Sequence, residues 1–147
     1  QHAKFVYGVD ASQQADEIAI DKSIDLKNVE FRLNPGLSVP FENGTIDCVY
    51  SNDLLEHLHP ADLKFHLEEI HRILKDGGKY LFWTPGSETG PHDITQCFYP
   101  RGMGFKPKAD HIKEYSFDEL ISIIREIGYK KIELPDLKKE ILMIAIR

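Results

Sequence analysis

The chain has 147 residues, 41% hydrophobic and 29% charged, a balance typical of one globular domain with a hydrophobic core. Its 24 acidic and 18 basic residues give a net charge of −6 without a basic stripe, which disfavours nucleic acid as a partner. The two cysteines form no disulfide or metal-binding pattern, and no apolar run is long enough to span a membrane. Because no signal peptide is evident either, we expect a cytoplasmic protein without a membrane partner, of undetermined oligomeric state.

The first predicted strand ends in an acidic residue. Residues 5–9 are apolar and β-prone, and Asp10 follows them directly. Ser12 is a suitable N-cap for a helix that runs to about Lys22. A carboxylate at a strand end can accept hydrogen bonds from two ribose hydroxyls, but it can also simply favour the dipole of the following helix. Residues 29–33 then alternate apolar and polar side chains, which predicts an edge strand.

The central stretch of the chain combines a turn, a strand and a cluster of polar residues. Asn43-Gly44 indicates a turn, and residues 46–50 form an apolar run that predicts a strand buried on both faces. Ser51, Asn52 and Asp53 follow at the carboxyl end of that strand, where open α/β sheets bind their ligands. Glu56 and His57 come one turn later, so a carboxylate and an imidazole should lie beside the same crevice.

The next helix and strand are indicated by apolar spacing and by glycines. Pro60 opens a helix whose end is predicted at Gly77, and a strand should follow over residues 79–84. His66 and His71 lie off the apolar stripe of this helix and are expected to be solvated. The stripe consists of leucine and isoleucine at helical spacing: Leu63, Leu67, Ile70 and Leu74.

The remaining segments complete an alternation of strands and helices. Residues 85–114 contain four prolines and four glycines, which indicates either a lid or acceptor-binding segment or an ordered structural insertion. Ser116 and Glu119 form a capping box for a helix that ends at Gly128. Two strands, 129–134 and 141–146, should follow, joined by a polar turn through Pro135-Asp136. The alternation predicts a doubly wound α/β sheet with helices on both faces.

The order of the motifs resembles a known family. Val39-Pro-Phe-Glu-Asn-Gly44, the Asp47 strand and Leu55-Glu-His57 occur as in class I S-adenosylmethionine-dependent methyltransferases, especially those acting on small molecules. The resemblance covers residues 5 to about 84 well and the rest loosely. It implies a Rossmann-like, mostly parallel sheet with a C-terminal antiparallel hairpin. It also implies a single domain, 1–147, with 85–114 inserted, and methyl transfer from S-adenosylmethionine to a small-molecule acceptor.

The resemblance assigns cofactor contacts to residues at the ends of three strands. Asp10 matches the acid that holds the ribose in the family. Pro35 stands where many members have an Asp that accepts the adenine amino group, so adenine recognition must use Asn34 or the backbone near Leu37. The residues implied to contact the cofactor are Asp10, Ala11, Asn34, Leu37, Ser51 and Asn52.

The family's first strand and its glycine-rich turn should precede residue 5, where only four residues stand. That strand lies between those ending at Asp10 and Ser51, which would otherwise be about 9–10 Å apart in the sheet. We expect an N-terminal segment of the natural protein to supply it. A strand from another chain, or a remodelled domain that has lost the cofactor, are the alternatives.

The candidate catalytic groups are two histidines and a glutamate. Methyl transfer needs orientation and often a base for the acceptor proton, and His57 and His92 are the best bases by residue type. Glu56 could orient His57, although both could instead mark a helix start against the crevice wall, and His92 could lie in a simple turn after Pro91.

Three other interpretations remain. Asp53-x-x-Glu56-His57 resembles the acid-x-x-Glu-His that can hold a divalent ion in ubiquinone-pathway O-methyltransferases, but Glu-His is widespread in members without metal, so no metal is predicted. A nicotinamide-dependent oxidoreductase also places an acid after its second strand. The Pro35 departure and the absent glycine turn favour a pseudo-methyltransferase or binding module.

Overall fold

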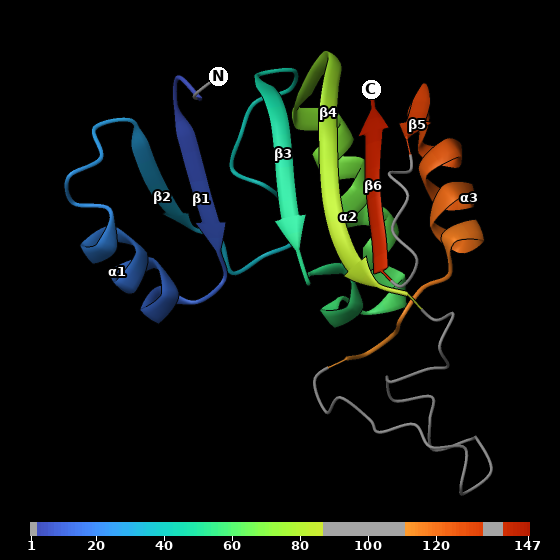
Figure 1. The fold of residues 1–147 in the computed structure, drawn as a ribbon, viewed down its shortest axis with the longest axis horizontal. Helices are drawn as coiled ribbons and strands as arrows, with labels where there is room; N and C mark the ends of the chain where they lie inside the picture. Colours follow the sequence, from blue (N-terminus) through green and yellow to red (C-terminus); the bar gives the residue numbers. More distant parts are fainter. Residues whose placement is uncertain (1–2, 87–110, 134–139) are drawn as a thin grey trace, which may run out of the picture. The chain divides into compact units, whose positions relative to one another are not determined.

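The computed structural model describes residues 3–86, 111–133 and 140–147, and the chain divides into two compact units, Gln1–Pro40 and Phe41–Arg147. Each unit is an α/β arrangement of its own (Figure 1). No helix in the described part of the chain is long and apolar enough to cross a membrane.

The first unit has one helix and two parallel strands. Strand β1 (Val6–Asp10) pairs in parallel with β2 (Val29–Leu33), and helix α1 (Gln13–Lys22) connects them. The Ser12 hydroxyl accepts a hydrogen bond from the amide of Ala15 at 3.3 Å, which satisfies one of the free N–H groups of the first helical turn. The predicted strand, cap and helix end are therefore confirmed.

The second unit contains a four-stranded mixed sheet in the order β3-β4-β6-β5. Strand β3 (Ile46–Asn52) runs parallel to β4 (Leu74–Pro85), whereas β6 (Glu140–Ile146) runs antiparallel to both β4 and β5 (Lys131–Glu133). The predicted antiparallel pair at the carboxyl end is confirmed. Its predicted turn, Pro135-Asp136, lies outside the described residues.

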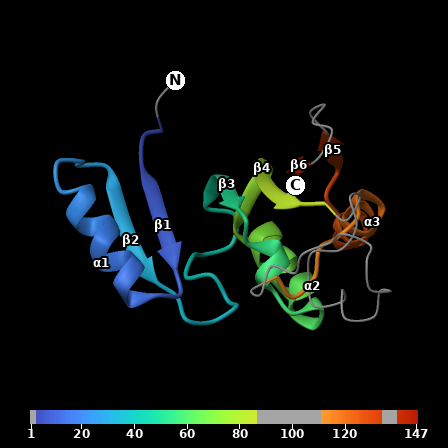
Figure 2. The same ribbon diagram turned by 60° about the horizontal axis from the view of Figure 1, so that its bottom comes forward.

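Both longer helices of this unit lie on one side of its sheet. The short 3₁₀ turn η1 (Leu55–His57) leads into α2 (Pro60–Ile73), and α3 (Phe117–Ile127) contacts α2 on the same side (Figures 1 and 2). The capping box is present, and Gly128 ends α3 in the left-handed conformation. The core between helices and sheet is formed by fully buried side chains, among them Leu63, Leu67, Tyr80, Phe82, Leu120, Ile124, Met143 and Ala145.

The prediction that the strands ending at Asp10 and Ser51 share one sheet is wrong: β1 and β3 belong to separate sheets. The physical reason is a missing pairing partner, because no strand in the described ranges pairs with both β1 and β3. β3 is also not buried on both faces, and Tyr50 is 64% exposed. Among the described strands β3 pairs only with β4, and the two longer helices of its unit lie on one side of the sheet.

Two details of α2 also differ from the sequence analysis. The helix ends at Ile73, and Leu74 already pairs with Ile46, so Gly77 is no helix cap. Gly77 instead lies within β4 in the left-handed conformation, where the β3–β4 register shifts, and its N–H donates to the carbonyl of Arg147. His66 is not fully solvated as expected: its Nε2 atom is buried, and this burial lowers the pKa of the imidazole to about 4.

Candidate functional site

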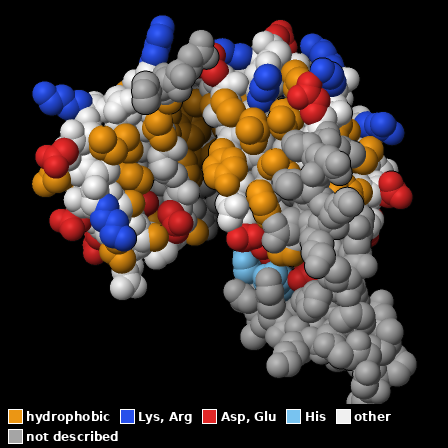
Figure 3. All heavy atoms as spheres, in the orientation of Figure 1, with side chains coloured by type: hydrophobic (Ala, Val, Ile, Leu, Met, Phe, Trp, Pro, Cys, Tyr) orange, Lys and Arg blue, Asp and Glu red, His pale blue; other side chains and the backbone are white. Residues whose placement is uncertain are grey.

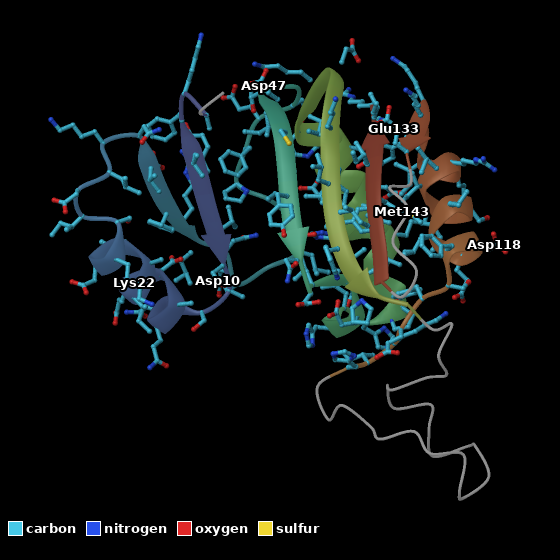
Figure 4. All side chains as sticks on the ribbon, in the orientation of Figure 1. Asp10, Lys22, Asp47, Asp118, Glu133 and Met143 are labelled. Carbon is cyan, nitrogen blue, oxygen red and sulfur yellow. The ribbon has the colours of Figure 1, made fainter. Side chains whose placement is uncertain are left out.

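The carboxyl end of β1 presents an exposed carboxylate. Asp10 lies at this end of the strand (Figure 4), where its Oδ1 accepts a hydrogen bond of 2.7 Å from the amide of Ser12. Its carbonyl oxygen accepts the amide of Asn34 at 2.7 Å, which joins the ends of β1 and β2. A carboxylate has about four acceptor positions, so Asp10 retains the capacity to bind a diol such as a ribose.

A hollow of about 220 Å³ opens beside this carboxylate. Its lining comes entirely from the first unit: Gly8, Val9, Asp10, Ala15, Asp16, Ala19 and Phe31. Ala11 lies exposed in the turn between β1 and α1, and Leu37 is 36% exposed after β2. The Asn34 side chain donates to the carbonyl of Gly36 at 3.1 Å, so part of its hydrogen-bonding capacity serves the turn.

Three polar residues, Ser51, Asn52 and Asp53, lie at the carboxyl end of β3 as the sequence analysis expected, but each already makes a side-chain hydrogen bond. The Ser51 hydroxyl lies 2.7 Å from the hydroxyl of Tyr80, whose pKa is raised by burial. Asn52 donates to the carboxylate of Asp53 at 2.7 Å. Asp53 has a positive φ of 48°, a conformation that is uncommon outside glycine and that redirects the chain toward η1.

Glu56 is the best-buried charged side chain of this region, with 0% exposure. Its Oε2 accepts a hydrogen bond of 2.9 Å from the hydroxyl of Thr84 on β4. Its backbone carbonyl accepts the amides of Ile112 and Lys113, at 2.8 and 3.2 Å, which fixes residues 111–115 against η1. Its Oε1 has no hydrogen-bond partner among the described residues.

Two imidazoles face this oxygen. The Nε2 atoms of His57 and His111 lie 3.8 and 4.0 Å from Glu56 Oε1, and the two rings meet edge to face at 5.2 Å. Nδ1 of His111 lies 2.7 Å from the carboxylate of Glu114, and both side chains are buried. The His57 side chain is 34% exposed, and histidines reach the surface near the carboxyl ends of β3 and β4 (Figure 3).

The structure thus brings together two of the three predicted catalytic residues, Glu56 and His57, whereas His92 lies outside the described residues. Sequence reasoning missed Thr84, His111 and Glu114. The His111-x-x-Glu114 spacing within a long polar segment was the available signal, because a carboxylate three residues away can hold an imidazole.

Comparison with known proteins identifies the domain. Residues 1–82, more than half of the chain, match the family model described as "Methyltransferase domain". The chain belongs to this methyltransferase domain family. Family membership implies S-adenosylmethionine as the cofactor.

Relatives of this methyltransferase domain differ in their acceptors. It is 25% identical to phosphoethanolamine N-methyltransferase 2 of Caenorhabditis elegans, across 94% of the chain and 31% of the relative. It is 31% identical to demethylmenaquinone methyltransferase of Lactococcus lactis, across 76% of the chain and 46% of the relative. The chain spans less than half the length of these curated relatives.

Solved structures confirm the Rossmann-like α/β fold class. The YcgJ protein of Bacillus subtilis superimposes with a TM-score of 0.72 at 16% identity, covering 98% of this chain and 82% of that protein. A methyltransferase of Aquifex aeolicus, described as dependent on S-adenosylmethionine, gives a TM-score of 0.66 at 21% identity, covering 97% of this chain and 68% of that protein.

Proposed function

We propose that the protein transfers the methyl group of S-adenosylmethionine to a small-molecule acceptor. Family membership supports the reaction class. The names of three relatives give phosphoethanolamine, sarcosine or dimethylglycine, and demethylmenaquinone as their acceptors, all of them small molecules. The observation that carries the proposal is the partly exposed His57 imidazole beside the buried Glu56 carboxylate, at the carboxyl ends of two parallel strands.

The cofactor would supply an electrophilic methyl group on a sulfonium. Asp10 would hold its ribose hydroxyls, for which the exposed carboxylate at the end of β1 fits. Ala11 and Leu37 would contribute backbone contacts, and Asn34 would contribute its side chain or backbone. Ser51 and Asn52 stay predictions as cofactor contacts, and the Ser51 hydroxyl already lies 2.7 Å from the hydroxyl of Tyr80.

The acceptor atom forms its bond to the methyl carbon as the carbon–sulfur bond breaks, and the proton of the acceptor must leave. His57 is the proposed base, since an imidazole accepts a proton near neutral pH, and the adjacent Glu56 carboxylate stabilises the imidazolium that results. His92 and the segment 85–114 stay predictions as a second base and as an acceptor-binding element.

The test combines cofactor binding with single-turnover methyl transfer. Asp10→Ala should weaken binding of S-adenosylmethionine in calorimetry by about ten- to a hundred-fold, because a charge-assisted hydrogen bond worth roughly 1.5–3 kcal/mol is lost. With sarcosine, dimethylglycine and phosphoethanolamine as trial acceptors, His57→Ala should lower the rate by about 10²–10⁴ and leave cofactor affinity nearly intact.

The matched control is His71→Ala, a histidine of α2 that packs against Tyr129 away from this cluster. It should keep the wild-type rate. Binding of the cofactor without methyl transfer to any trial acceptor would favour a binding module over an enzyme. If His57→Ala keeps the wild-type rate, His57 is not the base.

A further inference from the structure

The role of Glu56 in methyl transfer does not explain the surroundings of its Oε1 atom. The carboxylate is completely buried, yet this oxygen has no hydrogen-bond partner in the described part of the chain. Buried carboxylates without full compensation are costly, and nearly all of them are paired or bind a cation. The nearest candidates, Nε2 of His57 and Nε2 of His111, are 3.8 and 4.0 Å away, too far for a hydrogen bond.

We propose that Glu56, His57 and His111 bind a divalent transition-metal ion, with Zn²⁺ as the best match. One ligand atom from each residue lies within 4.8 Å of the other two. Zn²⁺ binds nitrogen and carboxylate oxygen at about 2.0–2.2 Å, so tetrahedral ligands are roughly 3.3–3.6 Å apart. The observed carboxylate-to-imidazole distances exceed that separation by only a few tenths of an ångström.

The type of ligand selects the class of metal. Two imidazoles and one carboxylate suit Zn²⁺ and its neighbours in the first transition row. Mg²⁺ and Ca²⁺ prefer sites made of oxygen atoms and water. The site therefore predicts tight binding of Zn²⁺ or Co²⁺ and weak binding of Mg²⁺.

The groups around the cluster orient its ligands in the way metal sites require. Glu114 holds Nδ1 of His111 at 2.7 Å, which leaves Nε2 of that ring directed at Glu56 with its lone pair available. The Thr84 hydroxyl donates a hydrogen bond of 2.9 Å to Glu56 Oε2, so Oε1 is the oxygen that remains to bind a metal. Such outer partners fix the tautomer and the orientation of the ligands.

This ligand set differs from the one that the sequence motif suggested. The motif names Asp53 as a third ligand, but the group that the structure gathers contains His111 instead. The side chain of Asp53 accepts a hydrogen bond from Asn52. His111 lies 54 residues after His57 and 55 residues after Glu56, so the spacing of residues in the sequence could not show this cluster.

Three protein ligands leave further coordination positions open, as in catalytic rather than structural zinc sites. The partial exposure of His57 makes such a position reachable from solvent. This part of the inference rests on the proposed function: an acceptor oxygen or nitrogen bound there would lose its proton more readily. In that state His57 is a ligand, and the metal replaces it as the group that promotes ionisation of the acceptor.

The decisive experiment measures metal binding without donor or acceptor. Protein treated with a chelator is titrated with Zn²⁺ by calorimetry, and Co²⁺ binding is followed by visible absorption, which reports coordination geometry. We expect one Zn²⁺ per chain. Glu56→Gln and His111→Ala should each weaken it by more than about 100-fold, and Glu114→Gln by about 10–100-fold. The control His71→Ala should bind as the wild type does.

Melting curves guard against variants that fail to fold. Zn²⁺ should raise the melting temperature of the wild type and of His71→Ala, and should leave that of folded Glu56→Gln unchanged. Absence of Zn²⁺ binding would overturn the proposal and favour a proton shared within the cluster. Equal binding by all variants would place the metal elsewhere and overturn it too. Because no step uses S-adenosylmethionine, neither result depends on whether the protein transfers methyl groups.

Discussion

The hydrogen bond from Thr84 to Glu56 gives the most direct test of the buried cluster. Thr84→Val keeps the shape of the side chain and the β-branched character that suits a strand, but it removes the hydroxyl that donates to Glu56 Oε2 at 2.9 Å. Both residues are 0% exposed, so no water replaces the lost donor at the surface. Leaving a buried acceptor unsatisfied costs about 1–3 kcal/mol. For a chain of this length, that corresponds to a fall in melting temperature of roughly 2–12 °C.

The assay is urea unfolding of the metal-free protein, followed by the fluorescence of Trp83. It is the single tryptophan of the chain and neighbours Thr84 on β4, so the signal reports the second unit. Thr45→Val is the matched control: its hydroxyl donates to the carbonyl of Glu42 in an exposed turn. This variant should change the free energy of unfolding by no more than about 0.5 kcal/mol.

A second background separates the hydrogen bond from packing. In Glu56→Leu the acceptor is gone, so adding Thr84→Val should cost much less than it does in the wild type. Equal costs in the two backgrounds would refute the reasoning, because the loss would then come from the strand and not from the carboxylate. A cost indistinguishable from that of Thr45→Val would refute it as well.

Three further predictions concern stability. Burial lowers the pKa of His66 from 6.5 to about 4, so the unfolded state takes up a proton at a higher pH than the folded state does. The free energy of unfolding should therefore fall by up to roughly 3 kcal/mol as the pH drops from 6.5 to 4. His66→Gln should flatten this part of a pH series of urea unfolding curves. Ser116→Ala removes the side-chain acceptor for the amide of Glu119 and should cost about 1 kcal/mol in the same assay, with an unchanged urea dependence. Gly128→Ala should lower the free energy of unfolding by about 1–2 kcal/mol, because the φ of Gly128 is 105°. Gly36→Ala, with open space around the added Cβ, should leave it nearly unchanged in circular dichroism melting. Equal effects of the two substitutions would contradict the conformational argument.

Elements with strong local signals could be predicted from the sequence. Ser12 and the Ser116 capping box set the starts of α1 and α3 through contacts within four residues, and Gly128 ends α3 for the same local reason. The antiparallel pair of β5 and β6 also followed from two apolar runs close together in the chain. These features depend on neighbours in the sequence, which is why patterns alone suffice for them.

Features that depend on distant partners could not be predicted in this way. The start of β4 at Leu74 is set by pairing with Ile46, and this pairing overrides the glycines that suggested a longer helix. The assignment of β1 and β3 to different sheets depends on which strands are present to bridge them. Glu56 and His57 were found because they adjoin each other, whereas His111 joins them only through the backbone bonds that hold residues 111–115 to η1.

The position of β6 constrains how the second unit can assemble during synthesis. Strand β5 precedes β6 in the chain, but β6 lies between β5 and β4, and β5 pairs only with β6 in the described part of the sheet. A nascent chain released up to Glu133 therefore carries a strand with nowhere to pair, and the exposed edge of β4 stays open until residues 140–146 leave the ribosome. Completion of this sheet should be a late, nonlocal event, and chains stalled before β6 should present the open edge to chaperones or to one another.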